Sequence, residues 1–70
     1  MSDIASIALA GMNASTAKFE ASAKRVVERP DADLASELVT QREAVLAFKA
    51  DLAVLRIANR MSKSLLDILV

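Results

Sequence analysis

The stretch DLASELVTQREAVLAFKADLAVLRIANRMSKSLLDILV, residues 33–70, decides the fold. Apolar residues recur in it at heptad spacing, which predicts one long helix with a seam that lies against other helices. One core position of this heptad holds Leu38, Val45, Leu52, Asn59 and Leu66, and the other holds Gln41, Phe48, Leu55, Ser62 and Leu69.

A first, shorter helix precedes this stretch. The segment Arg29-Pro30-Asp31-Ala32-Asp33 is the only break in the chain, because Pro30 disfavours helical geometry at Arg29 and has no backbone N–H to donate. Asp31 or Asp33 can cap the second helix. The short connection predicts an all-α fold, an antiparallel two-helix hairpin with a short helix at about 3–28, a turn at about 29–32 and a long helix at about 33–69. Residues 1–70 then form a single domain.

The apolar residues fall into two groups. A second stripe, Val54, Ile57, Met61, Leu65 and Ile68, lies away from the heptad seam, and one partner helix cannot cover both. The long helix also extends about ten residues beyond the end of the short one, so we expect other chains to cover it and form a multi-helix bundle or coiled coil. The predicted hairpin core is Ile4, Met12, Phe19, Val26, Leu38, Val45, Phe48, Leu52 and Leu55. The predicted oligomer interface is Val54, Ile57, Met61, Leu65, Leu66, Ile68 and Leu69.

Composition narrows the classes of partner. Nine basic and nine acidic residues give a net charge of zero, so we expect no electrostatic attraction to nucleic acid and no nucleic-acid partner. The longest uncharged run, residues 4–17, is shorter than the roughly 20 residues of a membrane span, and we expect no transmembrane segment. The first residues lack the basic start and apolar block of a cleavable secretory signal.

Catalytic chemistry has little support in this sequence. The chain has no His, Cys or Tyr, its carboxylates are scattered over polar helix faces, and its serines have no evident base partner. We therefore expect no enzymatic activity, no catalytic, cofactor-binding or metal-binding residues, no cofactor and no small-molecule substrate.

Three local features allow alternatives. Gly11, Ser15 and Ser22 are small enough to let a partner helix come close. For Gly11 the alternative is a frayed first turn, and close packing is the favoured interpretation. Asn59 either fixes register on the apolar seam or lies partly in water. The repeat Arg42, Lys49, Arg56 and Lys63 is more typical of a solvated bundle flank than of a phosphate-binding stripe.

Two segments carry a resemblance to a known family. SIALAGMNASTAKFEASAKRVV (6–27) resembles the N-terminal helix of the bacterial flagellar axial proteins, the rod, hook and hook-junction group. DLASELV (33–39) and EAVLAFKADLAVLRIANRMSKSLLDIL (43–69) are similar to the C-terminal helix of that family. The matching positions are Asp33, Leu34, Ala35, Glu37, Val39, Glu43, Ala44, Ala47, Phe48, Ala50, Val54, Ala58, Met61, Leu65 and Leu66.

The chain departs from the family pattern in three places. Residues 23–26 replace an asparagine-rich signature, Val45 and Leu46 replace a Gln-Arg pair, and the Pro30 turn replaces a sizeable β-rich central region. The resemblance therefore implies the helical terminal module alone. In the family, these termini pair as helices in the inner tube of the axial structure.

The expected function is structural. The resemblance implies a component of the bacterial flagellum, a basal-body rod or hook-like protein of cell motility, exported without a cleaved signal to the basal body. We expect a homo-oligomer that acts by helix–helix self-association, with other flagellar axial proteins as further partners. The alternative is a cytoplasmic helical adapter or chaperone-like binding module that uses its apolar C-terminal face.

Overall fold

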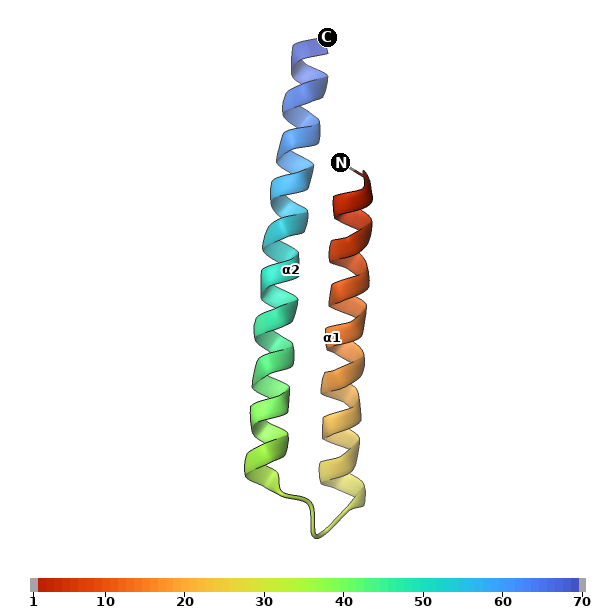
Figure 1. The fold of residues 1–70 in the computed structure, drawn as a ribbon, viewed down its shortest axis with the longest axis vertical. Coiled ribbons are helices and arrows are strands. Elements are labelled where there is room, and N and C mark those ends of the chain that lie inside the picture. The colour runs from red at the N-terminus through yellow and green to blue at the C-terminus, as the bar shows by residue number, and fades with distance from the viewer. Residues whose placement is uncertain (1, 70) are drawn as a thin grey trace.

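The chain forms two antiparallel helices that lie side by side (Figure 1). A computed structural model describes residues 2–69, with α1 at Ser2–Glu28 and α2 at Leu34–Leu69. The predicted all-α hairpin is confirmed, and the predicted helix ends lie within one residue of the observed ones. Both helices are long because proline is absent from their interiors and acidic residues, Asp3 and Glu37, lie in their first turns.

A five-residue connection closes the hairpin. The Ala32 amide donates to the Arg29 carbonyl oxygen at 3.1 Å, which forms a turn with Pro30 and Asp31 at its centre. Asp33 caps α2, because its Oδ1 accepts a hydrogen bond from the Ser36 amide at 3.2 Å. Of the two candidate caps, Asp33 is therefore the one that the structure uses.

The buried contact between α1 and α2 consists of small side chains. On α1 the buried residues are Ala8, Ser15 and Ser22, spaced seven apart, and on α2 they are Ala44 and Ala58. Ser22 is fully buried and Ala8 is 1% exposed. Side chains this small let two helix backbones come close together, so the contact is narrow.

Gly11 belongs to the same close contact. A Cβ atom at this position would lie 2.8 Å from Cγ of Asp51 on α2 and closer still to Oδ2 of the same side chain. The absence of a side chain therefore makes room for Asp51, which agrees with the packing interpretation of Gly11 rather than with a frayed turn.

This contact gives a testable coupling between Gly11 and Asp51. In an Asp51→Ala background, Gly11→Ala is expected to raise the free energy of unfolding by about 1 kcal/mol, because alanine is the better helix former. With Asp51 present the gain should be smaller, because the carboxylate has to rotate away from the new methyl group. Urea denaturation of the four variants measures the difference. Equal gains in both backgrounds would contradict the contact.

None of the nine residues of the predicted hairpin core is fully buried in the single chain. Four of its members are exposed in the single chain, namely Ile4, Phe19, Leu38 and Val45. The other five are half-buried, namely Met12, Val26, Phe48, Leu52 and Leu55. The four exposed residues lie along the edges of the contact, because the helices meet through alanine and serine and their close approach leaves the larger side chains there.

The C-terminal part of α2 extends past the N-terminus of α1 (Figure 1). The helices have 36 and 27 residues, and the register that sets Gly11 beside Asp51 brings the first residue of α1 to the height of Arg60. Residues 61–69, about 14 Å of helix, therefore have no α1 residue beside them. We call this segment the overhang.

Candidate interaction surface

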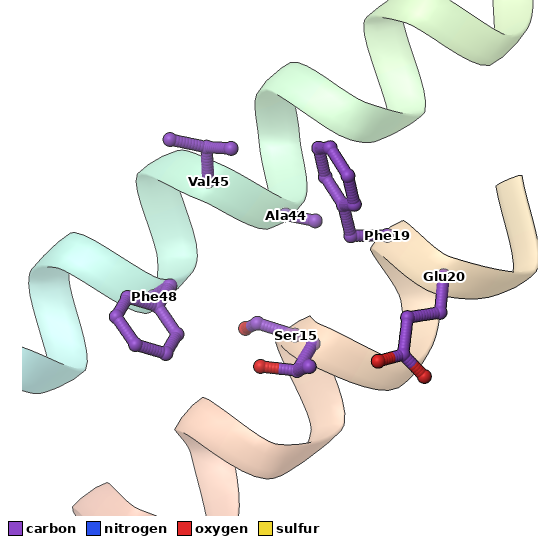
Figure 2. A pocket seen from close by; sticks show the side chains of 7 residues that line it. Ser15, Phe19, Glu20, Ala44, Val45 and Phe48 are labelled. Carbon is purple, nitrogen blue, oxygen red and sulfur yellow. The ribbon is translucent and has the colours of Figure 1, made fainter. Parts of the chain in front are cut away.

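One side of the hairpin carries an apolar groove between the two helices. The groove has a volume of about 360 Å³ and is lined by Ser15, Thr16, Phe19, Glu20, Ala44, Val45 and Phe48. Figure 2 shows these side chains, with Phe19 contributed by α1 and Val45 and Phe48 by α2. We call this side of the molecule the phenylalanine face.

The phenylalanine face continues along both helices. Residues seven apart lie on nearly the same side of a helix, so Met12 and Val26 share the side of Phe19, while Leu38 and Leu52 share that of Val45. Leu55 is likewise on the side of Phe48. Eight of the nine residues predicted as the hairpin core are therefore on one face of the hairpin, at the edge of the contact between α1 and α2.

The opposite side of the hairpin is more polar near the turn. A second groove of about 200 Å³ lies there, lined by Ser15, Lys18, Thr40, Glu43, Ala44 and Ala47. Charged and hydroxyl groups in this groove keep water close, so it offers less apolar surface than the phenylalanine face. The two sides of the hairpin therefore differ in chemistry over its turn-proximal half.

The residues predicted as an oligomer interface are all exposed in the single chain. Their exposed fractions range from 42% for Val54 to 81% for Leu69. Heptad spacing puts Leu66 and Leu69 on the phenylalanine face and Leu65 in line with the buried Ala44 and Ala58. The rest of the set, Val54, Ile57, Met61 and Ile68, forms a second apolar strip on the opposite side of α2. Their role as an interface remains a prediction.

A polar cluster links the helices near the turn. Ser22 Oγ lies 2.6 Å from Glu37 Oε2 and donates to it, and Arg25 Nε donates to Glu37 Oε1 at 2.8 Å. Gln41 Nε2 donates to Ser22 Oγ at 3.2 Å. Every buried side-chain nitrogen and oxygen among the described residues has a partner, so the cluster holds the turn end of the hairpin without an unsatisfied polar group.

The hydrogen bond from Arg25, followed by that from Ser22, holds the pKa of Glu37 below its usual value. The hydrogen bond between Arg25 and Glu37 also raises the pKa of Arg25. From the sequence, Glu37 is expected only as a negative charge near the first turn of the long helix. Its position was a usable signal, because Ser22 and Glu37 lie eight and seven residues from Pro30 and therefore meet across the turn.

This cluster predicts a pH dependence of stability. Because the Glu37 pKa is lower in the folded chain, the unfolded chain binds more protons as the pH falls below about 4.3, and stability decreases there. Above that pH the contribution is fully present. When the pH is lowered from 5 to 3, the urea midpoint of Glu37→Gln should fall less than that of the native chain. Glu43→Gln, which alters an exposed carboxylate, is the control and should keep the native slope.

Metal-binding clusters and membrane-spanning helices were sought among residues 2–69. No three His, Cys, Asp or Glu side chains gather into a possible metal site among residues 2–69. Within the same range, neither helix is long and apolar enough to cross a membrane. The basic residues Arg42, Lys49, Arg56 and Lys63 are exposed along one edge of α2, and Asn59 is exposed as well.

Comparison with known protein families, curated proteins and solved structures finds no match to this chain. The resemblance to flagellar axial proteins therefore rests on the residues quoted above alone.

Proposed function

We propose that this protein is a structural assembly protein that acts by helix–helix self-association. The observation that carries the proposal is the distribution of apolar side chains. Among the described residues, the buried apolar ones are three alanines, Ala8, Ala44 and Ala58, while 17 large hydrophobic residues are exposed. Burying exposed apolar surface against other chains stabilises an assembly by about 25 cal/mol per Å². The exposed side chains therefore favour association of this chain with other chains.

The apolar surface occupies more than one side of the molecule. The phenylalanine face and the strip of Val54, Ile57, Met61 and Ile68 lie on different sides of α2, so a single partner cannot cover both. A protein with two such surfaces can grow beyond a pair of chains. This arrangement suits a building block of an extended structure.

The resemblance suggests which structure the protein builds. On that basis we place it in the bacterial flagellar basal body as a rod or hook-like axial component that self-associates and contacts other axial proteins. Its two helices correspond to the helical termini that pair in the inner tube of the family's axial assembly. The export route would be the flagellar one, without a cleaved signal.

Sedimentation of the native chain tests self-association. Over protein concentrations from about 1 to 100 µM, the weight-average mass should rise above that of the 7.5 kDa chain and increase with concentration. A stable, folded monomer over the whole range would contradict the proposal.

A second candidate is a helical adapter or chaperone-like protein of the cytoplasm. It is favoured by the overhang, whose apolar residues Met61, Leu65 and Leu66 are half or more exposed and could cover a partner helix. Secretion separates the two functions. A flagellar component should leave motile cells only when the flagellar export machinery is intact, whereas an adapter should stay in the cytoplasm in both cases.

A further inference from the structure

We propose that the phenylalanine face is the site where a second copy of this chain docks, in parallel orientation, to form a four-helix bundle. The two turns then lie at the same end of the bundle, and α2 of each copy lies beside α1 of the other. This inference rests on the proposed self-association and specifies its first contact. The predicted hairpin core then becomes the core of the pair.

The amount of exposed surface fits a second copy. The chain exposes 5491 Å², whereas a compact protein of 7.5 kDa exposes about 4,200 Å². The excess of about 1,300 Å² is larger than the roughly 800 Å² that each partner buries in a stable interface. A symmetric pair of hairpins can therefore remove this excess without any other protein.

Docking on the phenylalanine face removes more apolar surface from water than docking on the opposite side of the hairpin. Its groove is apolar and open between Phe19 and Phe48, while the groove on the opposite side is lined by Lys18 and Glu43. The face also runs the length of the hairpin, from Leu38 near the turn to Leu66 and Leu69 on the overhang. In a two-fold pair, both copies use this same face.

Charge decides the orientation of the two copies. The edge of the phenylalanine face on α2 carries Arg42, Lys49, Arg56 and Lys63, all exposed. If the turns lay at opposite ends, a two-fold axis would set this edge beside the same edge of the second copy, with like charges opposed. The parallel arrangement sets it beside the edge of α1, where Glu20 lines the groove.

The register supports the same pairing. Glu20 is nine residues after Gly11, and Arg42 is nine residues before Asp51, so the contact of Gly11 with Asp51 brings Glu20 and Arg42 to the same height. Within one hairpin these two residues lie on opposite edges of the phenylalanine face. In a parallel pair, Arg42 of each copy comes beside Glu20 of the other, and two intermolecular ion pairs form.

A distance measurement tests the orientation directly. The chain has no cysteine, so Asp31→Cys in the turn carries a single spin label. In the parallel pair the labels should be separated by about 15–35 Å, because neighbouring helices lie about 8–10 Å apart and the label linkers add to this. A separation near the 60 Å length of the hairpin would overturn the parallel arrangement.

A matched pair of substitutions tests the face. Leu38 lies on the phenylalanine face and Val39 points about 100° away from it, and their side chains are similarly exposed, 61% and 56%. Leu38→Asp should weaken the pair by about 10-fold or more in Kd, as expected for one lost leucine contact, whereas Val39→Asp should change Kd less than threefold. Both residues are exposed in the single hairpin, so helicity by circular dichroism should persist. Equal effects of the two would overturn the assignment of the face.

Charge reversal tests the contact between Glu20 and Arg42. Glu20→Arg and Arg42→Glu should each raise Kd severalfold, and the double variant should recover most of the loss. Glu43→Arg, on the other side of the hairpin, should have no such effect. An Arg42→Glu variant that pairs more tightly would overturn the parallel arrangement in favour of adjacent α2 edges.

Failure of this inference differs from failure of the proposed function. A native chain that remains monomeric contradicts both. A chain that associates but is insensitive to Leu38→Asp contradicts only the docking face. A phenylalanine face that binds another helical protein and not a second copy overturns the choice of partner.

Discussion

Leu65→Asp combined with Ile68→Asp is expected to convert the assembled protein into a monomer. Leu65 and Ile68 are 52% and 79% exposed in the single chain and, being three residues apart, lie next to each other on one face of the overhang. Full burial of such a side chain stabilises an assembly by about 1.5–3 kcal/mol. Loss of both side chains from one copy should therefore raise Kd by a factor of about 100 to 10,000. Sedimentation over a concentration series measures the change.

The control for this variant is a new negative charge on the polar side of the same helix end. Arg60→Asp changes the charge as well but removes no large apolar side chain, so its mass distribution should stay close to that of the native chain. The hairpin itself should remain folded in both cases, because the overhang has no α1 residue beside it (Figure 1). A double variant that keeps the native mass would rule out the overhang as an interface.

Ala8→Leu is expected to destabilise the hairpin by about 1–3 kcal/mol. Ala8 is 1% exposed at the contact between α1 and α2, and a leucine there has to push the helices apart or adopt a strained rotamer. Alanine and leucine have similar helix propensities, so the change acts through packing rather than through the helix itself. Urea denaturation followed by circular dichroism, at one protein concentration, measures the loss.

Ala10→Leu is the matched control for Ala8→Leu. Ala10 lies on the same helix, two residues away, and is exposed. The same substitution there should change stability by less than about 0.5 kcal/mol. If Ala8→Leu is equally harmless, then the helices meet through larger residues, and the close contact through alanine and serine is incorrect.

The helices and the turn could be predicted from sequence because local chemistry determines them. Pro30 restricts the backbone at Arg29 and has no amide to donate, and Asp33 supplies an oxygen to a free amide of the next helix. These effects act within a few residues. They do not depend on which face of a helix meets a partner.

The pairing face could not be predicted in the same way. The heptad of Leu38, Val45 and Leu52 looks the same whether its partner is the first helix of the same chain or a helix of another chain. The structure pairs the helices through Ala8, Ser15, Ser22, Ala44 and Ala58 instead. Alanine and serine contribute little to the hydrophobic periodicity of a sequence, so a pattern of large apolar side chains does not identify them. Gly11, Ser15 and Ser22 were the indications of close packing in the sequence, and the structure buries both serines.

The two helices, the Pro30 turn, the greater length of α2 and the excess of apolar residues follow from local backbone preference or from composition. The packing of small residues within the chain and the open phenylalanine face follow only from the way the helices pair, because two helices can be close neighbours along just one side of each. Once alanine and serine occupy that side, Phe19, Val45 and Phe48 remain on the surface.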